Sequence, residues 1–215
     1  MTIVPDRLAA LFGGRGSVDR RAELTPTIRR LLAVRLLRSI AQGALAVDFA
    51  LYLDALGWSA TEIGLVLTGG GVALTAFGLG VGPLSDRLGR RRLLVGYQAL
   101  TVVTALVGLL TAAPLLLVPA AILGGFGRGS NGTAGAFAPA EQAWLAETAP
   151  PVARTWIYGL NSGLGFFGMG VGAFIGILPP FLEPWLPGPL AYRPLFAVAV
   201  VIAIAGGLIL AGTKE

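Results

Sequence analysis

The sequence predicts an all-α membrane protein with six transmembrane helices. Of its 215 residues, 55% are hydrophobic and only 13% are charged, whereas about 25% of the residues in a typical soluble domain are charged. Six apolar segments each reach the roughly 20 residues that a helix needs to cross a bilayer. These segments are continuous and rich in Leu, Ala and Gly, without the alternation of a membrane β-strand, so helices are expected rather than a barrel.

The six predicted spans follow a basic N-terminal tail and are joined by short connections. Residues 1–30 contain six arginines but no long apolar run, so we expect a tail outside the membrane, and residues 213–215 form a short C-terminal end. The segment between them, 31–212, is the predicted bundle. Its spans are expected at Leu31–Leu56, Glu62–Leu84, Leu93–Ala112, Pro114–Pro139, Thr155–Leu178 and Arg193–Gly212.

The arginines set the expected orientation in the membrane. Four of them lie between positions 87 and 92, in the connection after the second span, and Arg154 follows the fourth span, whereas the opposite connections hold only Arg193. Short cytoplasmic loops carry an excess of Lys and Arg. Both termini are therefore expected in the cytoplasm. The sequence has no readable organelle address, which favours a plasma membrane or a bacterial inner membrane.

The second and fifth spans each carry a face of small residues. Glycines or other small residues recur at helical spacing along both segments, a pattern typical of closely packed membrane helices. Two interpretations remain open: packing inside one bundle, and an interface with a second bundle. The candidate interface residues are Gly71, Gly78, Asn161, Gly165, Gly168 and Gly172.

The first and fourth spans each carry a polar stripe that lipid would not tolerate. Ionisable residues inside a membrane usually mark a functional site, so the two stripes predict a substrate cavity. Asp48 and Arg128 could form an ion pair that opens and closes to load and release a proton; the alternatives are a permanent structural pair, or an Asp48 solvated near the outer headgroups. The candidate cavity residues are Arg38, Gln42, Asp48, Tyr52, Arg128 and Asn131.

The composition argues against catalysis and against nucleic-acid binding. The chain has no histidine and no cysteine, which removes the usual general base, the usual zinc ligand and any thiolate. No catalytic residues, metal or cofactor are predicted. The formal charge of +5 comes from arginines placed mostly between apolar segments, and a membrane explains that placement better than nucleic acid does.

The connection between the second and third spans resembles the signature loop of the major facilitator superfamily. It reads Gly82-x-Leu-Ser-Asp86-Arg87-x-Gly89-Arg90-Arg. Arg128-Gly-x-x-Gly132 resembles the helix 4 arginine motif of that family, and Pro139-Ala-Glu141 leads on to Glu147 and Arg154. The fifth span is similar to the third motif of the family but lacks the Gly-Pro pair of antiporters, so antiport is not supported.

The resemblance covers about residues 31–212 and implies half of a major-facilitator-type fold. Members usually have two halves of six helices, each a 3+3 repeat; helices 1 and 4 line the cavity, helices 2 and 5 meet the other half, and helices 3 and 6 face outward. This chain resembles the amino-terminal half. The gating-loop residues implied are Gly82, Asp86, Arg87, Gly89 and Arg90.

The resemblance further implies a secondary transporter of a small solute that works by alternating access. Two copies of the chain could rebuild a full transporter as a parallel homodimer about an axis along the membrane normal. Asp86 would then approach the start of the fifth helix, near Thr155, in the partner. Arg38 and Arg128 favour an anionic solute, and protons are the candidate coupling ion.

Two alternatives stay open. The chain could pair with a separately encoded carboxy-terminal half, or be a piece of a longer transporter. It could also be a membrane protein that binds or regulates a partner without transporting anything.

Overall fold

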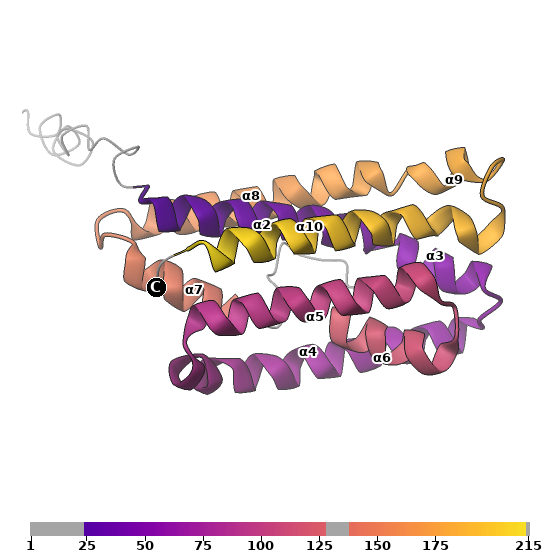
Figure 1. Ribbon diagram of the computed structural model, residues 1–215, viewed down its shortest axis with the longest axis horizontal. Coiled ribbons are helices and arrows are strands. Elements are labelled where there is room, and N and C mark those ends of the chain that lie inside the picture. Colours follow the sequence, from indigo (N-terminus) through magenta and orange to yellow (C-terminus); the bar gives the residue numbers. More distant parts are fainter. Residues whose placement is uncertain (1–23, 128–137, 214–215) are drawn as a thin grey trace, which may run out of the picture.

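Residues 24–127 and 138–213 of the computed structural model are described, and they contain helices but no strand. Figure 1 shows the long helices lying nearly parallel to one another. In chain order, the elements are α2 (Pro26–Leu45), α3 (Asp48–Ala55), α4 (Ala60–Leu88), α5 (Arg90–Leu110), α6 (Pro114–Gly124), α7 (Ala138–Thr148), α8 (Arg154–Ile175), α9 (Leu178–Leu182), the 3₁₀ helix η1 (Gly188–Tyr192) and α10 (Arg193–Ala211).

Within the described ranges, five segments are long and apolar enough to cross a membrane: Pro26–Ala55, Ala60–Leu88, Arg90–Leu110, Arg154–Leu182 and Gly188–Ala211. They correspond to the first, second, third, fifth and sixth predicted spans. The fourth predicted span is described only in part, because residues 128–137 lie outside the described ranges. Its first part is α6, which ends where Gly125 adopts a left-handed conformation with φ 75°.

The first span differs from the prediction at its start and in its interior. The Thr25 hydroxyl accepts a hydrogen bond from the Ile28 backbone N–H at 3.3 Å, and proline at the first helical position suits a helix start. Residues 26–30 therefore belong to α2 and not to the tail. The predicted continuous helix is also interrupted after Leu45, where the Ala46 N–H bonds to the Gly43 carbonyl, three residues back, at 3.3 Å.

The connection between the second and third spans is shorter than predicted. α4 runs on to Leu88 through Pro83, and α5 begins at Arg90. Gly89 alone separates the two helices; its φ of 85° is a conformation that glycine adopts without the steric cost of a side chain. The arginine-rich segment is thus a helical hairpin with a one-residue corner.

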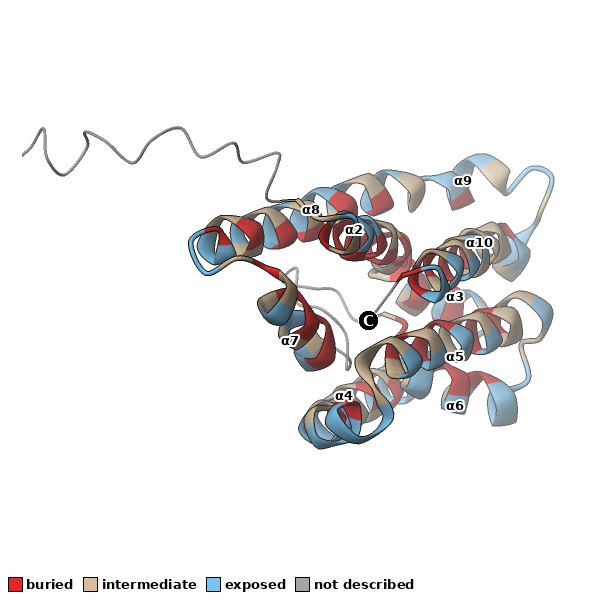
Figure 2. Ribbon diagram, turned by 60° about the vertical axis from the view of Figure 1, so that its left-hand side comes forward, coloured by how far each residue is buried: buried red, intermediate tan, exposed pale blue. Residues whose placement is uncertain are grey.

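The helices form two groups of three. α2 packs against α8 and α10, while α6 packs against α4 and α5, and Figures 1 and 2 show these groups on opposite sides of the bundle. α10 joins the two groups, because it also packs extensively against α5. The first span thus pairs with the fifth and sixth, and the described part of the fourth pairs with the second and third.

The glycine face of α8 is used inside the bundle. A Cβ atom added to Gly172 would lie 2.7 Å from the Ala44 backbone nitrogen, and one added to Gly168 would lie 2.8 Å from the Leu36 carbonyl oxygen. Gly165, Gly168 and Gly172 thus lie against α2 of the same chain, and Asn161 is buried on the same helix. This favours the interpretation of packing inside one bundle, and an interface of these residues with a second bundle stays a prediction.

The α4 glycines are placed differently. Gly71 and Gly78 have open space where a Cβ would stand, so the close packing expected of them is not made within the described part of this bundle.

The buried core is divided into two clusters. One lies at the arginine-rich end and includes Leu31, Trp144 and Ile157. The other lies at the opposite end, where Phe49, Phe126 and Phe196 meet with ring centroids 5.5 to 6.4 Å apart. On α2 the first cluster extends to Val34 and the second begins at Ala41, which leaves a short middle segment between them.

Two arginines hold the end of α10 at the arginine-rich end of the bundle. Arg30 of α2 donates to the Gly212 carbonyl, and Arg91 of α5 donates to the Ala211 carbonyl. Cationic side chains are favourable at a helix C-terminus because its last carbonyls are unpaired. The last helix is thereby tied to the first and third spans.

Candidate functional site

A polar layer occupies the middle segment of α2, between the two apolar clusters. Arg35, Arg38 and Ser39 are buried there, with exposed fractions of 2%, 6% and 1%. Arg38 forms an ion pair with Glu141, which α7 brings in from the side. Gln98 of α5 is also buried. It belongs to the same layer, since it lies on α5 between Leu94 of the first cluster and Ala105 of the second.

The Arg38–Glu141 pair is almost completely buried, since its side chains are 7% and 4% exposed. Arg35 lies close enough to both charges to interact with them electrostatically, and Tyr97 of α5 interacts with Arg38. Within the described part of the chain, Nε of Arg38 and Oε1 of Glu141 have no hydrogen-bond partner. Most buried polar atoms have a partner, so the pair retains unused hydrogen-bonding capacity.

A small cavity of about 30 Å³ adjoins Arg38. Gln42 of α2 and Tyr97 and Thr101 of α5 contribute polar groups to its wall, and Gly125 at the end of α6 helps to close it. This volume has room for a water molecule or a small polar group. The structure thus brings two predicted cavity residues, Arg38 and Gln42, to one cavity.

The other predicted cavity residues lie elsewhere. Asp48 begins α3, where its carboxylate lies against Gly176 of α8, and Tyr52 packs in the aromatic cluster with its ring 5.3 Å from that of Phe196. Ten residues of rise place Asp48 about 15 Å along the first span from Arg38. Arg128 and Asn131 lie outside the described residues, so the hypothesis of an Asp48–Arg128 pair is untested.

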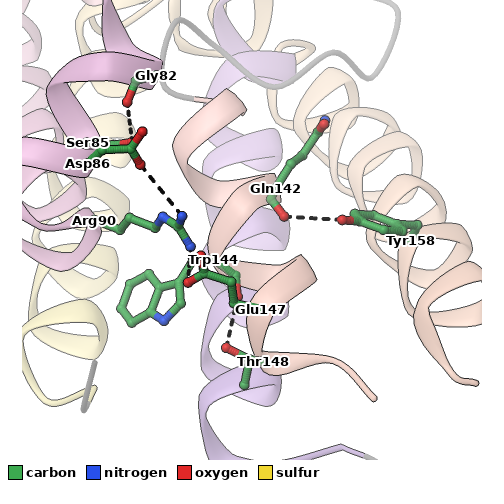
Figure 3. Close-up of polar contacts among 9 residues, drawn as sticks. All are labelled: Gly82, Ser85, Asp86, Arg90, Gln142, Trp144, Glu147, Thr148 and Tyr158. Carbon is green, nitrogen blue, oxygen red and sulfur yellow. Dashed lines mark hydrogen bonds and ion pairs between the residues drawn. The ribbon is translucent and has the colours of Figure 1, made fainter. Parts of the chain in front are cut away.

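A second polar cluster lies at the arginine-rich end, where the α4–α5 hairpin meets α7 (Figure 3). Arg90 forms ion pairs with Glu147 and with Asp86, the latter at 3.7 Å. Arg90 is 15% exposed, whereas the Asp86 and Glu147 side chains are 72% and 66% exposed. A cleft of about 370 Å³ opens among these residues and Trp144.

The gating-loop prediction can be compared with this cluster. Asp86, Gly89 and Arg90 line the cleft. The carbonyl of Gly82 accepts a hydrogen bond from the Ser85 hydroxyl at 2.7 Å, one turn before Asp86. Arg87 is exposed on the last turn of α4. Three of the five predicted residues therefore line the cleft, whereas Gly82 lies one turn earlier on α4 and Arg87 is not among the lining residues.

The sequence prediction missed Glu141 as a site residue. The sequence placed this residue only in the motif Pro139-Ala-Glu141, whereas the structure places it on α7, which turns Glu141 inward toward α2. A signal was present, because Arg38 needs a counter-ion and Glu141 stands in the mostly apolar stretch 138–146. Tyr97 and Thr101 were also missed, although they are polar residues within a predicted span.

The described ranges hold no group of acidic side chains that could bind a metal ion. Together, the two polar sites offer a buried cation beside a cavity and an exposed charge cluster at one end of the bundle. This arrangement is suited to binding and gating.

Comparison with known protein families shows which family this chain matches. The family model described as Major Facilitator Superfamily matches residues 31–214, a range that includes both polar sites. No curated protein matches the chain.

Proposed function

Because the chain belongs to the major facilitator superfamily, a family of secondary membrane transporters, we propose that it moves a small solute across a membrane by alternating access. The observation that carries this proposal is the buried Arg38, which lines a small cavity together with Gln42, in the middle of the bundle. Burying a guanidinium in a membrane costs free energy, so an arginine in such a position usually has a function. Its positive charge suits an anionic solute. The positive-inside rule supports a cytoplasmic position for the arginine-rich end, in a plasma or bacterial inner membrane.

The proposal includes a second bundle, supplied by a second copy of the chain in the same orientation. α4 supports this because three of its large apolar side chains, Leu65, Val72 and Leu79, are 67%, 67% and 78% exposed. Gly71 and Gly78 leave open space on the same helix, where another helix could approach closely. Two identical faces related by a two-fold axis would cover each other.

Cysteine crosslinking tests this dimer, because the chain has no cysteine of its own. We expect Gly78→Cys to give a covalent dimer in lipid nanodiscs, with a total mass of two 22.1 kDa chains. The matched control is Gly96→Cys on α5, which is also an exposed helical glycine with open space around it and should give no dimer. A monomer in nanodiscs, or crosslinking through Gly96→Cys alone, would contradict the dimer.

Asp86 is proposed to stabilise the dimer with its arginine-rich end closed, by approaching the start of α8 near Thr155 in the partner. Its carboxylate is 72% exposed, and the first residues of α8 are exposed as well. A carboxylate is favourable at a helix N-terminus, by about 0.5 kcal/mol. Two such contacts per dimer would shift the balance of open and closed states about fivefold.

We therefore expect Asp86→Asn to increase access to the cavity from the arginine-rich end by about fivefold. The measurement is the rate at which a membrane-impermeant maleimide labels Gln42→Cys from that side of an oriented vesicle. Asp54→Asn, which changes an exposed carboxylate at the other end of the bundle, is the control. Equal labelling rates in both variants would show that Asp86 has no gating role.

A further inference from the structure

The buried ion pair between α2 and α7 has the features of an occupied anion site. Arg38 and Glu141 are each more than nine-tenths buried, and each keeps one polar atom without a partner in the described part of the chain. Arg38 also lines a cavity whose wall includes the polar side chains of Gln42, Tyr97 and Thr101. The guanidinium thus has a carboxylate bound to it and room beside it for another small group.

We propose that a carboxylate-bearing solute binds to Arg38 by displacing Glu141, and that Glu141 takes up a proton when it is displaced. This inference rests on the proposed transporter function and names its substrate class and its coupling ion. A guanidinium binds carboxylates in a planar, two-pronged geometry. Glu141 therefore acts as an internal substitute for the solute in the empty bundle.

The charges balance in this exchange. In the empty state, the positive Arg38 is paired with the negative Glu141. When a solute carboxylate takes the place of Glu141, a buried carboxylate would be left without its counter-ion, which strongly favours its neutral form. One O–H bond forms on Glu141 with a proton from water. One anion and one proton therefore enter together, and the net charge of the site is unchanged.

The groups around Glu141 make the two events interdependent. Among the described groups, Arg35 and Arg38 of α2 interact with Glu141, and Tyr97 of α5 interacts with Arg38. On α4 the nearest acid, Asp86, is engaged with Arg90 at the end of the bundle, as is Glu147 of α7. Glu141 supplies the negative charge beside these two guanidinium groups until the solute brings its own. Proton uptake therefore follows solute binding.

Acetate is the probe for this exchange. Its binding is measured by the rise that it causes in the melting temperature of the whole chain in nanodiscs. Acetate stays ionised between about pH 6 and pH 8. If one proton is taken up for each anion bound, the apparent acetate affinity should rise about tenfold for each unit by which the pH falls. Asp54→Asn, which alters an exposed carboxylate outside both polar sites, should keep this slope.

Two variants of the pair complete the experiment. Glu141→Gln should bind acetate more tightly and with no pH dependence, because the amide vacates Arg38 and takes up no proton. The double variant Arg38→Gln with Glu141→Gln should not bind acetate, and it keeps the test decisive if the single variant fails to fold. A pH-independent affinity in the unaltered chain, no acetate binding to it, or binding that survives in the double variant would each overturn the proposal.

The outcome can be separated from that of the dimer experiment. The Arg38–Glu141 pair lies within one chain, so pH-linked acetate binding by a monomer would support this inference while contradicting the homodimer. A covalent dimer without pH-linked acetate binding would support the homodimer and contradict this inference.

Discussion

Replacing Glu141 by glutamine is expected to lower the free energy of unfolding by about 3 to 5 kcal/mol. The loss follows from burial: Arg38 would remain charged in a position where its side chain is only 7% exposed, with its counter-ion removed. Removing one member of a buried ion pair leaves an uncompensated charge, which costs far more than the net contribution of the pair. The measurement is denaturant unfolding in detergent micelles, in a buffer without carboxylates.

Two further variants separate charge burial from other effects of the substitution. Glu147→Gln removes a carboxylate that is 66% exposed, so its loss should stay below about 1 kcal/mol. The double variant Arg38→Leu with Glu141→Leu removes both charges and should recover most of the stability that the single variant loses. A double variant as unstable as Glu141→Gln would show that the uncompensated charge is not the cause.

Gly172→Ala is expected to lower the free energy of unfolding by about 2 to 3 kcal/mol, as overpacking does in a tightly packed core. The added Cβ would stand 2.7 Å from the Ala44 backbone nitrogen and 2.8 Å from the Gly43 Cα. These are backbone atoms, which cannot rotate out of the way, so α2 and α8 must separate. The same unfolding measurement applies.

Gly170→Ala is the matched control for this substitution. Gly170 lies two residues away on the same helix and is exposed, with no atom within 4 Å of an added Cβ. Alanine there should be neutral or stabilise α8 by up to about 1 kcal/mol, because glycine is the poorer helix former. Equal losses in the two variants would contradict the close approach of α2 and α8.

The spans were predictable because each depends on a local property, the length of an apolar run. The boundaries were harder. Arg29 and Arg30 were assigned to the tail for their charge, although Thr25 and Pro26 form a helix start. The corner after Leu88 was expected to be longer, because a run of arginines resembles a loop and does not show that Gly89 alone turns the chain.

The candidate site was predictable only in part, because contacts between distant residues leave no local pattern. The glycine spacing of α8 indicated a close approach but could not identify α2 as the partner. Arg38 was found from its position in an apolar span, whereas its counter-ion lies 103 residues later. Pairing the two requires the packing of α7 against α2, which no single segment of the sequence encodes.

The division of the core has a consequence for how the bundle can move. Each end has its own apolar cluster, and the layer between them is held by charges and hydrogen-bonding groups. Separating the helices at one end would therefore expose the cluster at that end only, while the cluster at the other end keeps the helices together. In the proposed alternating access, Arg38 would therefore lie between the end that opens and the end that stays closed.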